Sequence, residues 1–240
     1  MKQYEFKTAS KKMLGDLHTP VSIYLKVRDI YPESALLESS DYHGDENSLS
    51  YIALCPLARI GINNRESIST FPDGHVEKLP LSSPTDAFMV FLSRFNIDGT
   101  DKNVCGLFGY TAFDAVRYFE NIPVMEAHHA ENDAPDMLYI LYKYILVFDH
   151  FKNELTLIEL LAADETNHLQ EIETLIENRN YASYNFHTIG NESSTITDDE
   201  YKGMVRKGIK HCLRGDVFQI VLSRRFEQAF KGDDFKVYRA

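Results

Sequence analysis

Tryptophan is absent from the 240-residue sequence, and cysteine occurs only three times, at Cys55, Cys105 and Cys212. These cysteines lie far apart and form no C-x-x-C pair, so the spacing of a zinc site or a redox-active dithiol is missing. We therefore expect three reduced, buried thiols. The nine histidines are scattered. The adjacent pair His128 and His129 would point its rings apart on a helix or strand, which argues against a metal site there.

The sequence also lacks an excess of basic residues and a long apolar run. Its formal net charge is −11 at pH 7, whereas surfaces that bind nucleic acid are usually basic. No apolar stretch approaches the ~20 residues of a membrane-spanning helix. The start, MKQYEFKTASKK, has no apolar segment typical of a secretory signal. The sequence therefore predicts a cytoplasmic protein that binds neither nucleic acid nor membranes.

No catalytic residue can be assigned from residue types alone. A G-x-S-x-G motif or a comparable nucleophile signature is absent. The acidic pairs at 198–199 and 233–234 stand at expected helix starts, where the helix dipole favours carboxylates. Gly106 and Gly109 form a G-x-x-G pattern, which a tight turn or close backbone packing explains better than phosphate binding. We predict neither a catalytic residue nor a metal ligand in this chain.

The pattern of apolar residues predicts an α+β fold with antiparallel sheets and packed helices. Hydrophobic residues make up 44% and charged residues 25% of the chain, as in globular proteins. Closely spaced strands with short connections favour antiparallel pairing. The expected strands are 19–27, 50–56, 58–62, 75–81, 135–150, 153–160 and 216–230, with a hairpin turn at DHFKN (149–153). The expected helices are 82–95, capped by Ser83, one from about Ala112, 164–180, and one from a Thr197–Glu200 capping box to Gly215.

A domain boundary is expected in the segment 182–197, which is rich in Ser, Thr and Asn and has no periodicity. It would link a first domain, 1–181, to residues 198–240. The final stretch, KGDDFKVYRA, begins a capped helix that continues for only about two turns. We interpret the chain as an amino-terminal fragment of a longer polypeptide.

The stretch LLESSD places a carboxylate directly after an apolar strand. The ammonium group of a small zwitterion needs a fixed carboxylate and hydroxyl acceptors, which Glu38 and Ser39 could supply beside Leu37 and the preceding leucine. The alternative is a solvated turn at the end of the strand, which Asp41 and His43 would favour. The local sequence leaves both open.

Four separated stretches, LLESSD, GLFGYTAFDAVRYFE, PDMLYILYKYILVFDHFKNELTLI and GDVFQIVLSRRF, together resemble anthranilate synthase component I of the chorismate-utilising enzyme superfamily. This resemblance implies an α+β fold and a large subunit that converts chorismate to anthranilate and pyruvate in tryptophan biosynthesis. It also implies Mg²⁺, ammonia supplied by a glutamine amidotransferase subunit (component II), and feedback inhibition by tryptophan. Gln219 in the last motif could line the chorismate site, although a structural strand residue is the simpler interpretation.

The resemblance assigns the tryptophan pocket to Leu37, Glu38 and Ser39. Many relatives have a basic residue before the next strand, where this chain has Ser48 and Leu49. The first predicted domain would be regulatory and the last would begin the chorismate-binding domain. The catalytic motifs are missing, so the fragment would be inactive and would bind no Mg²⁺. Aminodeoxychorismate synthase component I and a non-catalytic amino-acid-binding module remain alternatives.

Overall fold

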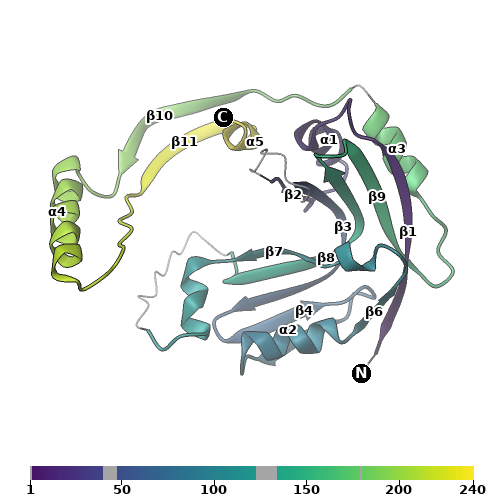
Figure 1. The fold of residues 1–240 in the computed structure, drawn as a ribbon, viewed down its shortest axis with the longest axis horizontal. Coiled ribbons are helices and arrows are strands. Elements are labelled where there is room, and N and C mark those ends of the chain that lie inside the picture. Colours follow the sequence, from purple (N-terminus) through teal and green to yellow (C-terminus); the bar gives the residue numbers. More distant parts are fainter. Residues whose placement is uncertain (1, 40–47, 123–133, 179) are drawn as a thin grey trace. The chain divides into compact units, whose positions relative to one another are not determined.

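The computed structural model of the chain combines helices with one large and one small β-sheet (Figure 1). It divides into two compact units, Met1–Tyr181 (unit 1) and Ala182–Ala240 (unit 2). The structure describes residues 2–39, 48–122, 134–178 and 180–240. The α+β fold class predicted from the sequence is confirmed.

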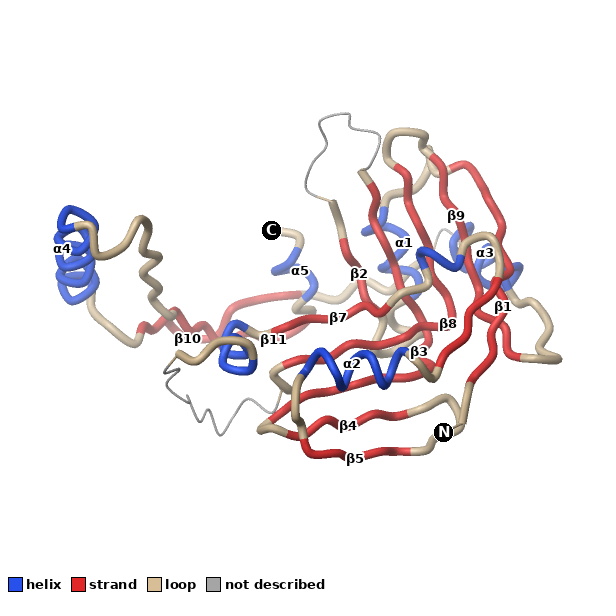
Figure 2. Tube along the Cα trace, turned by 60° about the horizontal axis from the view of Figure 1, so that its bottom comes forward, coloured by secondary structure: helices blue, strands red, loops and turns tan. Residues whose placement is uncertain are grey.

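Unit 1 is built on a nine-stranded sheet in the order β5-β4-β3-β8-β9-β1-β6 within the described residues (Figure 2). In addition to this path, β2 pairs with β3 and β7 with β8. The strands are β1 Tyr4–Leu14, β2 Ala35–Leu37, β3 Leu49–Asn63, β4 Glu66–Thr70, β5 Val76–Pro80, β6 Phe95–Asp98, β7 Leu107–Thr111, β8 Met137–Asp149 and β9 Glu154–Ala162.

The two longest strands, β3 and β8, pair antiparallel from Leu49 opposite Asp149 to Ile62 opposite Met137. The sequence predicted two strands separated by Pro56, but β3 is continuous. Its register shifts at Pro56, and the preceding Cys55 has a φ of 61°, so a bulge accommodates the residue without an N–H. Among the described strands, β1 and β6 form the single parallel pair.

Three α-helices belong to unit 1 within the described residues: α1 Pro20–Val27, α2 Pro84–Leu92 and α3 Leu169–Glu177. The predicted start of α2 is confirmed, because Ser83 Oγ accepts the Asp86 backbone N–H at 3.5 Å. The predicted 164–180 helix is confirmed as the shorter α3, which has Leu169, Ile172 and Ile176 buried. Two short 3-10 helices, η1 Lys102–Val104 and η2 Phe113–Tyr118, complete the unit.

The predicted strand at 19–27 is wrong, because these residues form α1. The Val, Ile, Tyr and Leu residues of this stretch, with Pro20 at its start, suggested a strand. However, Thr19 and Ser22 form a capping box in which each side chain accepts the other residue's backbone N–H. Pro20 occupies the first turn, where its missing N–H costs nothing. These local signals outweigh the β-prone composition.

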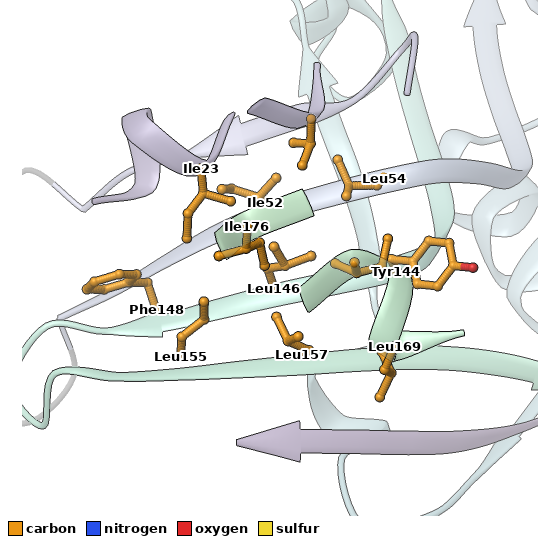
Figure 3. Close-up of a cluster of buried hydrophobic side chains, with 12 residues drawn as sticks. Ile23, Ile52, Leu54, Tyr144, Leu146, Phe148, Leu155, Leu157, Leu169 and Ile176 are labelled. Atoms are coloured by element: carbon orange, nitrogen blue, oxygen red, sulfur yellow. The ribbon is translucent and has the colours of Figure 1, made fainter. Parts of the chain in front are cut away.

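Helices α1 and α3 cover one part of the sheet through a shared apolar cluster (Figure 3). Lys26 of α1 also donates to the Ile176 carbonyl of α3 at 2.5 Å. The cluster's buried residues come from both helices and from β3, β8 and β9: Ile23, Val27, Ile52, Leu54, Tyr144, Leu146, Phe148, Leu155, Leu157, Leu169, Ile172 and Ile176. A second cluster lies under α2, which buries Phe91 there.

Gly109 lies in β7, where the backbone of β8 approaches closely. A Cβ atom at this position would be 1.9 Å from the Leu138 carbonyl oxygen. Close backbone packing, the preferred explanation of this glycine, is confirmed. A Cβ at Gly106 would meet nothing within 4 Å. The helix predicted from Ala112 is the 3-10 helix η2.

Unit 2 contains β10 Phe186–Ser194, α4 Asp198–Arg214, β11 Phe226–Gly232 and α5 Phe235–Tyr238. The predicted boundaries of α4 are confirmed. Thr197 and Glu200 form the capping box, and Gly215 ends the helix with a φ of 78°. Strands β10 and β11 pair antiparallel.

Two predictions for unit 2 are wrong. The segment 182–197, expected as a loop, contains β10, whose residues pair with β11 although few of them are buried. The strand expected at 216–230 is present only from Phe226. Residues 216–225, including the exposed Gln219, have no strand partner in the described part of the chain. Alternating apolar residues do not form a strand without a backbone partner.

The three cysteines are free thiols, but only Cys105 is fully buried. Burial raises the pKa of the Cys105 thiol to about 11. Burial also raises the pKa of Cys55, which is half-buried. Cys212 is exposed, which contradicts the expectation of three buried thiols.

Candidate functional site

The pairing of β2 with β3 determines where the predicted site residues lie. Leu36 of β2 lies opposite Ile52 and packs against the cluster under α1 and α3. Leu37 lies opposite Tyr51 and is 41% exposed. Successive strand residues point to opposite faces. The two leucines therefore cannot form one apolar wall, and only Leu37 remains on an open face.

Tyr51 supplies an aromatic surface next to Leu37 that sequence reasoning missed. Its ring centroid lies 5.9 Å from that of Phe108 in β7, and Phe108 lies 6.1 Å from Tyr142 in an edge-on arrangement. Leu37 therefore adjoins a row of rings that runs across β3, β7 and β8. Aromatic side chains of this kind favour contact with a flat apolar or aromatic ligand.

Ser39 is held by a hydrogen bond from its backbone. Its N–H donates to Ser50 Oγ at 3.2 Å, and Ser50 is only 1% exposed. Ser50 Oγ also lies 2.7 Å from Nε2 of His150. The His150 backbone N–H in turn donates to the Ser48 carbonyl oxygen at 3.1 Å. The ends of β2, β3 and β8 are thereby joined.

Glu38 lies between these two attachments and is half-buried. On one side Leu37 is in register with Tyr51, and on the other Ser39 is bonded to Ser50. A carboxylate partly withdrawn from water accepts hydrogen bonds from a cation more strongly than one in bulk solvent does. The backbone around Glu38 is therefore attached to β3 on both sides.

The turn that carries His150 is itself well ordered. Asp149 accepts the backbone N–H groups of Phe151 at 3.1 Å and of Lys152 at 2.9 Å, and the Lys152 ammonium at 3.0 Å. Burial acts to raise the pKa of Asp149, but the hydrogen bonds from Lys152 and Phe151 outweigh it, so the pKa is lowered. The predicted hairpin between β8 and β9 is confirmed, and Asn153 in its turn has a φ of 51°.

The position where relatives were expected to have a basic residue carries no cation here. Ser48 is buried, and Leu49 lies opposite Asp149. Neither Ser48 nor Leu49 can therefore supply a positive charge beside residues 37–39. Asp41 and His43, which favoured a solvated turn, lie outside the described residues.

Surface hollows are found elsewhere. One of about 120 Å³ lies between the β4–β5 hairpin and α2, lined by residues such as Ser69, Phe71 and Phe91. Another is lined by residues of unit 2, including Glu192, Thr197 and Arg224. Neither is lined by residues 37–39.

No group of three or more His, Cys, Asp or Glu in the described ranges is placed to hold a metal ion. No step of a reaction is therefore assigned to a metal in this chain.

Among the helices of the described part, none has the length and apolarity needed to cross a membrane.

Comparison with known proteins identifies the family. Residues 33–240 match the family described as chorismate binding enzyme. The chain belongs to this family. It is 33% identical to anthranilate synthase alpha subunit 1, chloroplastic, of Arabidopsis thaliana, over 56% of this chain and 26% of that protein. It is 28% identical to anthranilate synthase component 1 of Thermus thermophilus, over 96% of this chain and 49% of that protein.

A solved structure shares the fold of this chorismate-binding family member. The crystal structure of anthranilate synthase component I from Streptococcus pneumoniae TIGR4 aligns with a TM-score of 0.55 and 21% identity, over 95% of this chain and 51% of that chain. The predicted resemblance in family and fold is confirmed. The Thermus thermophilus and Streptococcus pneumoniae proteins match nearly the whole of this chain. The chain in turn spans only about half the length of either protein.

Proposed function

We propose that this chain is the regulatory, amino-terminal portion of an anthranilate synthase component I, the enzyme that forms anthranilate and pyruvate from chorismate and ammonia. One observation carries this proposal. Relatives named anthranilate synthase match 96% of the chain in Thermus thermophilus and 98% in Arabidopsis thaliana. A likeness along almost the whole chain is stronger support than a shared short motif would be.

We further propose that the end of β2 contributes to a feedback site for tryptophan. Glu38 would accept the ligand's ammonium group, Ser39 would help to fix it, and Leu37 with Tyr51 would contact the indole. The support is Glu38, a half-buried residue on a backbone held by β3. Because Ser48 and Leu49 stand where many relatives are expected to have a basic residue, the cation for the ligand's carboxylate would come from another segment.

The catalytic step and its Mg²⁺ belong, in this proposal, to the part of the relatives that the chain does not match. This chain would then be inactive by itself. Ammonia would come from a glutamine amidotransferase subunit, in keeping with the names "component 1" and "alpha subunit" of the relatives. Isolated chain that formed anthranilate from chorismate and ammonia would contradict this division of roles.

Product analysis tests the proposed reaction. The complete product of the gene, incubated with chorismate, ammonium and Mg²⁺, should form anthranilate and pyruvate. Formation of 4-amino-4-deoxychorismate instead would identify an aminodeoxychorismate synthase. Binding of tryptophan with no consumption of chorismate would indicate a non-catalytic amino-acid-binding module. Chromatography separates the two products, anthranilate being detected by its fluorescence, and calorimetry detects the binding of tryptophan.

Variants at the end of β2 test the proposed tryptophan site. Glu38→Ala and Ser39→Leu should raise the tryptophan inhibition constant of the complete gene product at least tenfold, since charge-assisted hydrogen bonds contribute about 1.5–3 kcal/mol each. Glu120→Ala removes an exposed carboxylate elsewhere in unit 1 and serves as the matched control. Unchanged inhibition in both site variants would rule out this assignment.

A further inference from the structure

The hydrogen bonds behind Ser39 lead to a histidine with no assigned role. Ser50 Oγ accepts the Ser39 backbone N–H and lies 2.7 Å from His150 Nε2. We propose that His150, acting through Ser50, is a positioning residue for the amino-acid site at the end of β2. This inference rests on the proposed feedback function and adds to it two residues that do not themselves contact the ligand.

The imidazole ring of His150 is held in place independently of Ser50. The backbone N–H of His150 donates to the Ser48 carbonyl oxygen, and the ring centroid of His150 lies 4.9 Å from that of Phe148. Phe148 is buried in the cluster under α1 and α3 (Figure 3). The following residues are fixed by Asp149, which accepts two backbone N–H groups of the turn. The ring is therefore a rigid partner for Ser50.

His150 affects Ser39 by fixing the orientation of the Ser50 hydroxyl. A hydroxyl has one hydrogen and two lone pairs, and the Ser39 N–H occupies one lone pair of Ser50. Either the Ser50 hydroxyl donates to Nε2, or a protonated Nε2 donates to the second lone pair. Both arrangements fix the rotation of the hydroxyl. Because Ser50 is 1% exposed, bulk water cannot take over the role of the imidazole.

The consequence for binding is preorganisation. Glu38 is bracketed by the register pair Leu37–Tyr51 and by the Ser39–Ser50 bond. Loss of the second attachment leaves the backbone after Leu37 free to move, and that freedom must be lost again when a ligand binds. We expect such a loss to weaken ligand binding about tenfold, the equivalent of one hydrogen bond.

Tryptophan binding measured by calorimetry on the complete gene product tests the inference. His150→Phe keeps a ring against Phe148 but removes Nε2, while His150→Gln retains a hydrogen-bonding group. Ser50→Ala removes the hydroxyl. Ser69→Ala is the matched control, since Ser69 is another buried serine of the same sheet, in β4. Thermal midpoints are recorded for every variant.

We expect His150→Phe and Ser50→Ala to raise the dissociation constant for tryptophan about tenfold. His150→Gln should raise it less than about threefold, and Ser69→Ala should leave it unchanged. Rescue by glutamine separates positioning through a hydrogen bond from a general packing role. If His150→Phe does not fold, Ser50→Ala and His150→Gln carry the comparison.

If Ser50→Ala and His150→Phe have the same tryptophan dissociation constant as the wild type, this inference is overturned. The tryptophan site itself would still stand. Equal weakening in His150→Gln and His150→Phe would also overturn it, because the hydrogen bond would then not matter. A wild-type protein that does not bind tryptophan would overturn the feedback site itself, and the inference with it.

Discussion

Replacing Glu159 with alanine is expected to destabilise unit 1 by about 2–4 kcal/mol. Glu159 lies in β9 and is 0% exposed. Its Oε2 accepts the His168 backbone N–H at 2.7 Å, directly before the first turn of α3. Its Oε1 lies 3.7 Å from the Lys143 ammonium. The carboxylate therefore fixes the start of α3 to the sheet.

The magnitude follows from what each partner loses. The backbone N–H of His168 would lose a charge-assisted hydrogen bond, which contributes about 1.5–3 kcal/mol. Lys143 would keep a second carboxylate, Glu165, at 3.2 Å, so it would not become an isolated buried charge. The small cavity left in the sheet adds to the cost. The sum of about 2–4 kcal/mol overlaps only the lower part of the 3–5 kcal/mol typical of a fully broken buried ion pair.

Denaturant unfolding followed by near-ultraviolet circular dichroism measures this effect through the tyrosines packed in unit 1. Glu159→Gln keeps an oxygen for the His168 N–H and should cost less than alanine. Glu154→Ala, in the same strand, breaks the exposed ion pair with Lys12 and should cost less than about 1 kcal/mol. The reasoning fails if Glu159→Ala is no more destabilising than Glu154→Ala, or if glutamine is as harmful as alanine.

Three further measurements test the packing and the turn beside the candidate site. Gly109→Ala should destabilise unit 1 by about 1–3 kcal/mol, because the added Cβ would meet the β8 backbone. Gly106→Ala should be tolerated, and similar unfolding midpoints for the two variants would contradict the close approach of β8 to Gly109. In alkylation followed by mass spectrometry, Cys212 should react first and Cys105 last, since burial raises the pKa of Cys105 to about 11; early labelling of Cys105 would contradict its burial. Asp149 has a lowered pKa in the folded state, so the unfolded state binds more protons and the stabilisation is lost as the pH falls below the ordinary value of 3.8. Asp149→Asn should therefore narrow the difference in urea midpoint between pH 7 and pH 3, and an unchanged difference would contradict the role of the turn.

The features predicted correctly from the sequence are those with local causes. The caps of α2 and α4 depend on residues at most three positions apart, and the β8–β9 hairpin depends on two apolar runs with a short polar turn between them. The prediction at 19–27 failed because it was based on the β-prone residues of this stretch, with Pro20 read as a strand start, and the Thr19 cap was overlooked. The capping box was present in the sequence and could have identified α1.

The candidate site was only partly accessible to sequence reasoning. Leu37, Glu38 and Ser39 were found as a motif, and the chain's family was found from separated stretches. Ser50 and His150 were missed, because they are 100 residues apart and neither has a local signal. Tyr51 was missed because the register of β2 against β3 decides which residue lies beside Leu37.

The sequence by itself determined the family, the α+β class, the start of α2 and the ends of α4, since these follow from composition, motifs and contacts within one helical turn. Only the tertiary structure decided that β2 ends beside the start of β3 and the end of β8, and that the polar segment 186–194 is a strand. The physical reason is that strand pairing is satisfied by backbone groups far apart along the chain. Their register, and the side chains that it brings together, is a property of the folded sheet.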